Sequence, residues 1–304
     1  MQPKKSPITS LRNRRVVEAR KLTQRKHRVR QDRFLVEGLQ LLAMAVERID
    51  AGDAARIQPL EVFYSEEDFV GEAAPRLLNR LAAEGADAIA VAPHVLETLS
   101  EREQSQGLAG TFALHRLEAT LEDIGATIGP APALVLVLDR LQDPGNLGTL
   151  IRTADAVGAR GVILFEPCAD PFDPKTVRGT MGSIFNVPLV RLDEAEALWP
   201  WLQRSGLQTV GADPGAGKTV WEGRSLAGST ALFLGNEARG LSADLRRGLT
   251  DFVALPLLGK AESLNVAVAG GVLMYEWLRT NRSQDAPRAR RTPEDDRAGW
   301  KEES

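Results

Sequence analysis

The feature that most constrains the fold is a set of short, continuously apolar runs in the second half of the chain. They read ALVLVLD (133–139), GVILF (161–165), VPLV (187–190), LQTVGA (207–212), TALFLG (230–235) and FVALP (252–256). Helical stretches separate most of these runs, and strands without polar positions are typical of sheets buried on both faces. We therefore predict an α/β domain over residues 133–281, with a mainly parallel sheet covered by helices on both sides.

A smaller α/β domain is predicted before it, over residues 31–117. Apolar positions from Leu39 onward follow a helical period, and strand-like VFYS (62–65) and AIAV (88–91) alternate with helical segments. Residues 118–132 mix acids, glycine and proline, which favours a linker. The charged, proline-containing segment 282–304 predicts a disordered tail.

Composition excludes several classes of protein. Apolar residues make up 43% of the chain and charged residues 26%, and no apolar run approaches the length of a membrane span, so no membrane partner is expected. Cys168 is the single cysteine and the three histidines lie far apart, so neither a disulfide nor a metal site is expected. This cysteine usage is typical of a reducing compartment, here the cytoplasm.

Residues 1–30 form a basic segment, here called the basic arm. It contains eleven lysines and arginines against one acid, Glu18. A solvated tail and a mitochondrial transit peptide share this composition, so the charge alone leaves the role open. If the partner is RNA, clustered cations gain affinity by releasing counterions from phosphates. The predicted RNA contacts in the arm are Arg14, Arg15, Lys21, Arg25, Lys26, Arg28 and Arg30.

The stretch ADPGAGKTVWEG (212–223) satisfies a relaxed nucleoside-triphosphate loop pattern through Gly217, Lys218 and Thr219. A phosphate-binding loop needs a long helix directly after it, because the helix N-terminus faces the anion. Here Gly223 and Gly228 leave no room for such a helix before the strand at 230. We predict a surface loop and no NTPase activity.

Three other stretches place polar residues beside predicted strand ends. In LDRLQDPGNLGTLIRTADAVGA (138–159) a turn precedes a helix that Asn146 is expected to cap, with Arg152 on its solvent side. In LFLGNEARGLS (232–242) a strand runs into Gly235, Asn236 and Glu237, and open α/β sheets bind ligands at such ends. In LPLLGKAESLNVAVAGGVLMYEWLR (255–279) Ser263 is expected to cap the last helix.

Together these stretches resemble the three signature motifs of the SpoU (TrmH-like) family of the SPOUT superfamily, which are RNA ribose 2′-O-methyltransferases. The matching positions are Asn146, Gly148 and Arg152; then Gly235, Asn236, Glu237 and Gly240; then Pro256, Ser263, Leu264, Asn265 and Val266. Segment 177–190 is similar to a further block of the family. The N-terminal domain is similar to the family's substrate-binding domain, which is L30e-like, that is, ribosomal-protein-like.

The resemblance implies a trefoil-knotted SPOUT domain, a homodimer formed through it, and S-adenosylmethionine as methyl donor. Gly235, Leu255 and Leu264 are expected to contact the cofactor through their backbone, with Pro256 shaping the pocket. Arg152 is the implied catalytic residue, and Asn146, Glu237, Ser263 and Asn265 complete the catalytic set. Because a guanidinium keeps its proton far above neutral pH, we expect Arg152 to orient phosphate and stabilise charge rather than act as a base.

Two alternatives to a ribosomal RNA methyltransferase stay open at this point. One is a tRNA 2′-O-methyltransferase, and the other is a non-catalytic RNA-binding protein with a SPOUT-like domain. The presence of Asn146, Arg152, Glu237, Ser263 and Asn265 together favours an enzyme. The additional N-terminal domain favours ribosomal RNA as the substrate.

Overall fold

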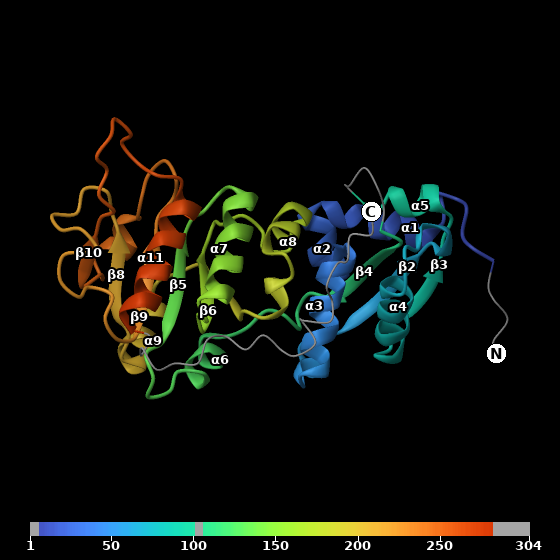
Figure 1. Ribbon diagram of the computed structural model, residues 1–304, viewed down its shortest axis with the longest axis horizontal. Coiled ribbons are helices and arrows are strands. Elements are labelled where there is room, and N and C mark those ends of the chain that lie inside the picture. Colours follow the sequence, from blue (N-terminus) through green and yellow to red (C-terminus); the bar gives the residue numbers. More distant parts are fainter. Residues whose placement is uncertain (1–5, 101–105, 282–304) are drawn as a thin grey trace, which may run out of the picture.

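Two α/β units lie side by side along the long axis of the computed structural model, which describes residues 6–100 and 106–281 (Figure 1). The predicted tail at 282–304 lies outside the described residues. No helix within these two ranges is both long and apolar enough to cross a bilayer.

The C-terminal unit contains a six-stranded sheet with the strand order β10-β8-β9-β5-β6-β7. Every neighbouring pair of strands is parallel, which confirms the predicted sheet. The strands are β5 (Leu134–Asp139), β6 (Gly161–Phe165), β7 (Leu189–Leu192), β8 (Gln208–Ala212), β9 (Thr230–Leu234) and β10 (Asp251–Val253).

Helices cover both faces of this sheet, as the apolar strands require. Along β5, Leu134, Leu136 and Leu138 join one core cluster while Val135 and Val137 join another, because successive side chains point to opposite faces. The first cluster lies under α7 (Pro144–Ala156), α8 (Pro174–Thr180) and α11 (Val266–Asn281), and the second under α6 (Leu121–Ala126), α9 (Leu198–Ser205) and α10 (Ala243–Arg246).

The N-terminal unit contains a four-stranded mixed sheet with the order β1-β4-β2-β3. Its strands β1 (Arg33–Glu37), β4 (Leu108–Ala113) and β2 (Pro59–Tyr64) are antiparallel neighbours, and β3 (Asp87–Ala90) runs parallel to β2. Its helices are α1 (Arg14–Arg20), α2 (Arg25–Gln31), α3 (Leu39–Asp50), α4 (Ala73–Ala83) and α5 (Pro93–Glu97), and short 3₁₀ turns cover Lys21–Thr23, Asp53–Ala55, Glu66–Asp68 and, in the other unit, Ser183–Phe185.

The part of the basic arm that the structure describes is packed on the N-terminal unit. Residues 14–31 form α1, a 3₁₀ turn and α2, and Val16, Ala19 and Leu22 are fully buried against the N-terminal sheet. These three apolar positions recur at helical spacing between the basic ones, so the segment has a core-facing side. The predicted boundary at residue 30 is therefore corrected: this segment belongs to the N-terminal unit.

The predicted linker 118–132 also contains ordered structure. Thr120 and Asp123 form a reciprocal capping box at the start of α6, and Leu121 and Ile124 are buried against the larger sheet. The connection between the units is thus partly a helix packed on the C-terminal unit.

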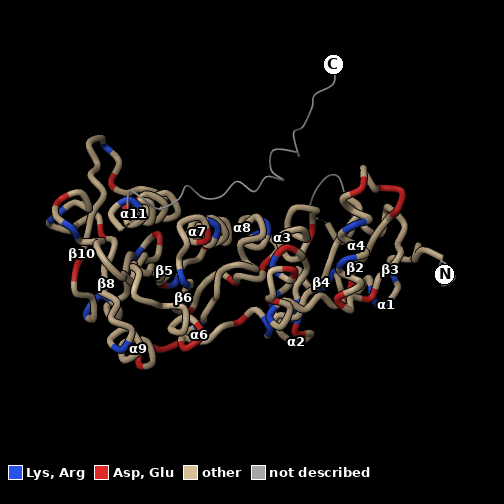
Figure 2. The backbone as a smooth tube through the Cα atoms, turned by 60° about the horizontal axis from the view of Figure 1, so that its bottom comes forward, with Lys and Arg blue, Asp and Glu red and all other residues tan. Residues whose placement is uncertain are grey.

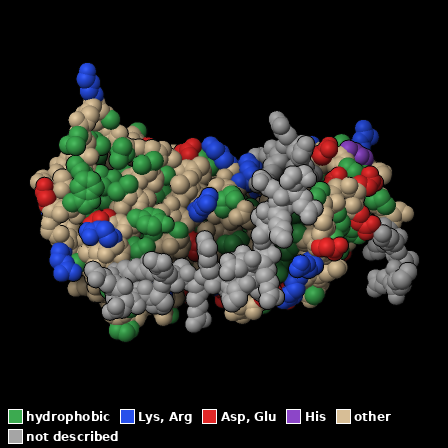
Figure 3. All heavy atoms as spheres, in the orientation of Figure 1, with side chains coloured by type: hydrophobic (Ala, Val, Ile, Leu, Met, Phe, Trp, Pro, Cys, Tyr) green, Lys and Arg blue, Asp and Glu red, His purple; other side chains and the backbone are tan. Residues whose placement is uncertain are grey.

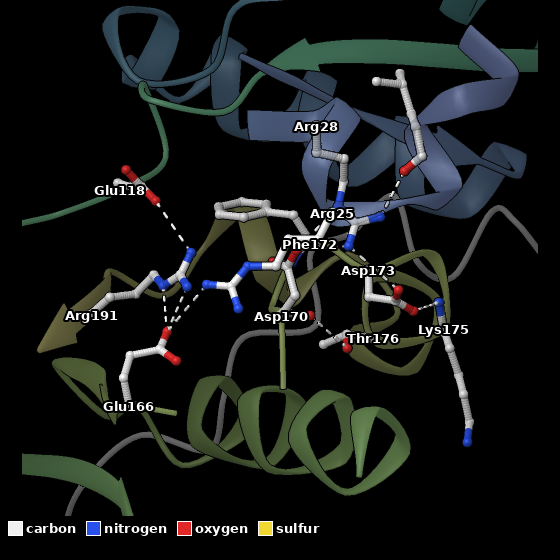
Figure 4. A network of polar contacts seen from close by, with 11 residues as sticks. Arg25, Arg28, Glu118, Glu166, Asp170, Phe172, Asp173, Lys175, Thr176 and Arg191 are labelled. Carbon is white, nitrogen blue, oxygen red and sulfur yellow. Dashed lines mark hydrogen bonds and ion pairs between the residues drawn. The ribbon is translucent and has the colours of Figure 1, made fainter. Parts of the chain in front are cut away.

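Apolar and charged contacts join the two units. Phe34 and Phe112 of the N-terminal unit pack against Phe172 and Phe185 of the other. Beside them Arg28 is 1% exposed and donates from Nε and Nη2 to Asp170 at 3.1 and 2.7 Å (Figure 4). The Arg28 guanidinium is buried in this junction and paired with Asp170, so its predicted role as an RNA contact is wrong.

Candidate functional site

A cavity of about 400 Å³ lies at the carboxyl ends of β8, β9 and β10, beside the first turn of α11. We call it the cofactor cavity. Three of the sequence stretches meet there, because the parallel strands end at one edge of the sheet. It is lined by Gly235, Asn236, Glu237, Leu255, Leu257, Ser263, Leu264 and Asn265, with Ala212, Asp213, Pro214, Leu234, Gly240, Val253, Val266, Ala269 and Leu273.

Gly235 is required by a close approach of backbone to backbone. A Cβ atom at this position would collide with the backbone of Gly240 and Leu241. The loop between them closes on itself, because Asn236 and Gly240 exchange both backbone hydrogen bonds, at 3.0 and 2.8 Å. Gly240 adopts a φ of 67°, which glycine allows without strain. The loop therefore presents main-chain atoms directly to the cavity.

A hydrogen-bonded chain links three loops at the mouth of the cavity. The Asn146 side-chain amide donates to Glu237 Oε1 at 3.1 Å, and its Oδ1 accepts from Asn265 Nδ2 at 3.0 Å. Glu237 also accepts from the backbone N–H groups of Gln142 and Asp143, both at 3.4 Å. Residues from 142–146, 237 and 265, distant in sequence, are thus fixed relative to one another.

The helix caps differ from those predicted. Asp143 caps α7 by accepting from the Asn146 backbone N–H at 2.7 Å, and this hydrogen bond lowers the pKa of the Asp143 carboxyl. At α11, the Asn265 side chain accepts from the N–H groups of Ala267 and Val268. Asn146 and Ser263 are not the caps. The shift leaves the Asn146 side chain free to join the chain of polar contacts.

The remaining predicted site residues are placed as follows. Ser263 and Leu264 line the cofactor cavity, whereas Pro256 lies between two lining residues without lining it. Arg152 is exposed on α7 and does not line the cavity. Within 6–100 and 106–281 its side chain forms no hydrogen bond or ion pair, so its guanidinium is available to an external anion.

Most basic side chains of α1 and α2 have acidic partners, and Figure 2 shows both signs of charge in this region. Arg15 contacts Asp87 at 2.5 Å, and Lys21 and Arg30 share Glu18. Arg25 lies 4.0 Å from Glu166. Arg14 and Lys26 are exposed and have no such partner in the described chain.

Sequence reasoning missed the contribution of the segment after β8. Asp213 and Pro214 line the cofactor cavity, although they belong to the stretch with the nucleotide-loop pattern. Lys218 pairs with Asp251 at 2.6 Å, and no long helix follows it before β9. The signal that could have found Asp213 is strand adjacency, because β8 lies between β9 and β10.

Comparison with known proteins bears directly on this arrangement. Residues 133–275 match the SpoU rRNA Methylase family, and residues 13–110 match the MRM3-like substrate binding domain. The 23S rRNA (guanosine(2553)-2′-O)-methyltransferase RlmP of Bacillus subtilis is 32% identical over 88% of this chain and 97% of its own length. The chain belongs to the SpoU rRNA methylase family.

Two further proteins are similar to this chain over most of their length. The 23S rRNA (uridine(2479)-2′-O)-methyltransferase of Streptomyces viridochromogenes is 32% identical, covering 85% of this chain and 86% of its own. The crystal structure of an AdoMet-bound rRNA methyltransferase from Sinorhizobium meliloti superposes with a TM-score of 0.79 at 32% identity, covering 91% and 99% of the two chains. The predicted family, α/β fold, methyltransferase class and S-adenosylmethionine (AdoMet) dependence are confirmed; the trefoil knot stays a prediction.

Proposed function

We propose that this protein transfers a methyl group from AdoMet to the 2′-hydroxyl of a nucleotide in ribosomal RNA. The observation that carries the proposal is the contact chain from Glu237 through Asn146 to Asn265 at the mouth of the cofactor cavity. It places polar groups from three motifs beside a cavity of the size that holds small molecules. The 23S rRNA relatives support ribosomal RNA as the substrate.

The residues of the cavity fit AdoMet. Its walls include the side chains of Leu234, Leu255 and Leu273, which suit a purine ring, and the close approach at Gly235 exposes main-chain donors and acceptors. Leu255 and Leu264 line the same space and are proposed to add backbone contacts, with Pro256 shaping the turn between Leu255 and Leu257. When bound, AdoMet supplies an electrophilic methyl group on a sulfonium centre.

The protein side chains must orient the ribose and stabilise charge on its oxygen, because a 2′-hydroxyl is a poor nucleophile at neutral pH. We assign Arg152 to the adjacent phosphate and to the developing oxyanion, since its guanidinium has no partner within the described chain. Asn146, held between Glu237 and Asn265, positions the ribose. Ser263 lines the cavity and is assigned a contact with the same sugar.

A homodimer through α11 is part of the proposal. Leu264, Val268, Val272 and Tyr275 are between 40% and 54% exposed, and Figure 3 shows apolar side chains gathered on the face that α11 presents. A contiguous apolar patch of this kind is typical of an interface. We also place the protein in the cytoplasm, with the unpaired Arg14 and Lys26 as RNA contacts of the N-terminal unit.

The test uses radiolabelled AdoMet with purified ribosomal RNA and, separately, total tRNA. We expect label in ribosomal RNA and a block to reverse transcription at one 2′-O-methylated position. Arg152→Ala should lower kcat about 10²- to 10³-fold with unchanged AdoMet affinity, as expected for lost charge stabilisation. Arg204→Ala, an exposed arginine on α9, is the control. Label confined to tRNA would favour the alternative substrate, and no label in any RNA would favour a non-catalytic protein.

A further inference from the structure

A second cavity of about 460 Å³ borders the same Asn236–Gly240 loop as the cofactor cavity. Asn236 and Gly240 line both cavities, so the two cavities are neighbours at this loop. The second cavity is at the carboxyl ends of β5 and β9 and is lined by Asp139, Arg140, Gln142, Pro167, Asn236, Arg239, Gly240 and Ser242. Most of these polar residues have no role in the proposed catalysis or cofactor binding. The exception is the Gly235–Gly240 loop, which also borders the cofactor cavity.

Arg140 holds an unfavourable backbone conformation in this cavity. Its φ is 55°, in the left-handed region that glycine adopts without strain and a residue with a Cβ does not. Hydrogen bonds fix the backbone there: the Arg140 N–H donates to Phe165 O at 2.9 Å, and its carbonyl accepts from Asn236 Nδ2 at 2.8 Å. Gln142 Nε2 donates to the same carbonyl at 3.0 Å. Glycine would satisfy this geometry better, so the arginine side chain has to contribute something else.

Several buried polar atoms around the cavity form no hydrogen bond. Asp139 Oδ1, Arg140 Nε and Ser242 Oγ are buried and form no hydrogen bond. Asp139 is 1% exposed and lies 3.8 Å from Arg140 Nε, while the Arg140 side chain is 43% exposed. The carboxylate is therefore on the buried side of the guanidinium, which also lies 5.7 Å from the centre of the Phe165 ring. The two Nη atoms of Arg140 form no hydrogen bond within residues 6–100 and 106–281, and the side chain is 43% exposed.

Arg239 adds a second exposed guanidinium to this cavity. Its backbone N–H is fixed by Asn236 Oδ1 at 3.1 Å, and its exposed side chain has no partner among the described residues. The accessible charged groups of the cavity are thus two arginines, since the Asp139 oxygens are buried and one already accepts from the Ser242 N–H. A donor-rich lining of this kind matches an anion, and arginine forks match phosphate oxygens in particular.

We propose that the second cavity binds a phosphodiester group of the substrate RNA between Arg140 and Arg239, next to the nucleotide that is methylated. The inference rests on the proposed function, because only an RNA substrate brings a phosphate beside the cofactor cavity. A nucleobase is the less suitable ligand: its edge presents donors as well as acceptors, and the accessible arginines of the cavity only donate.

The test measures RNA binding and turnover for Arg140→Gly, Arg239→Ala and the double variant on a ribosomal RNA transcript. Glycine fits the φ of 55°, so Arg140→Gly removes the guanidinium without straining the backbone. We expect each single variant to raise the KM for RNA about tenfold, as expected for a lost charge-assisted hydrogen bond, with kcat and AdoMet affinity nearly unchanged. Arg204→Ala, exposed on α9 and outside both cavities, should match the wild type.

The salt dependence of RNA binding identifies the contacted group. Losing one phosphate contact to a single strand should flatten the slope of log K against log salt by about 0.7. A raised KM with an unchanged slope would mean a base contact and would overturn the proposal. The proposal would also be overturned if the Arg140 and Arg239 variants bound RNA as tightly as the Arg204→Ala control. The same holds if they lost as much affinity for AdoMet as for RNA. Absence of wild-type turnover would count against the proposed function, while the binding slopes would still test this cavity.

Discussion

Breaking the buried ion pair between the two units should destabilise the protein strongly. Arg28 is 1% exposed and Asp170 9% exposed, and they are joined through two nitrogen atoms at 3.1 and 2.7 Å. Arg28 Nη1 also donates to Leu22 O at 2.7 Å. Arg28→Ala leaves Asp170 Oδ2 and this carbonyl without the Arg28 donors, while Asp170 Oδ1 still accepts from the Phe172 N–H. Removing one partner of a buried pair costs about 3–5 kcal/mol, mostly through the uncompensated charge.

Urea denaturation followed by tryptophan fluorescence and circular dichroism measures this cost. Arg30→Ala is the matched control, since Arg30 is exposed on the same helix and should leave the unfolding curve in place. The double variant Arg28→Met/Asp170→Leu should recover most of the loss, because it removes both charges and fills the space. If Arg28→Ala and Arg30→Ala unfold at the same urea concentration, the ion pair does not stabilise the junction and the reasoning is refuted.

Three further results are expected. Gly235→Ala should abolish AdoMet binding in calorimetry, because its Cβ would displace the Gly240 backbone, whereas Gly217→Ala, with open space around it, should bind normally. Burial raises the pKa of the Cys168 thiol to about 12, so a thiol reagent should modify it at pH 8 only after denaturant is added; rapid modification of the native protein would contradict this. Asp143→Ala should lower the unfolding free energy by about 1 kcal/mol at pH 7, and the deficit should vanish as pH falls through the lowered pKa of Asp143; a deficit independent of pH would exclude the cap.

The larger sheet could be predicted from the sequence because its strands are apolar at every position. The runs at 133–139 and 161–165 correspond to β5 and β6. The strand β1 (Arg33–Glu37) was not predicted, since only three apolar residues lie between its charged ends and a clear helix follows directly. The helices α1 and α2 were not predicted, because the segment was interpreted from its positive charge. The helical spacing of the buried Val16 and Ala19 is the signal that indicates a helix there.

The site was predictable where a motif specifies backbone geometry and less so where long-range packing decides. Gly235 and Leu264 could be placed in one cavity from their resemblance to the family motifs, and both line the cofactor cavity. The sequence could not show that Asp143 rather than Asn146 caps α7, because both residue types are suitable caps. The Asn146 side chain instead contacts Glu237, which is distant in sequence. Arg28 illustrates the same limit: its partner Asp170 is 142 positions away.

The position of Asn146 depends on the junction between the units as well as on its own loop. Thr176 Oγ1 donates to the Asp170 carbonyl at 3.0 Å, so the residue that binds Arg28 is also tied to α8. α8 in turn packs closely on α7, where a Cβ on Gly148 would lie 2.7 Å from Thr176 O. α7 begins at Pro144 and carries both Asn146 and Arg152. A contiguous set of packed elements therefore connects the N-terminal unit to α7, so the proposed RNA contacts of the N-terminal unit and the proposed catalytic Arg152 are held in one packed structure.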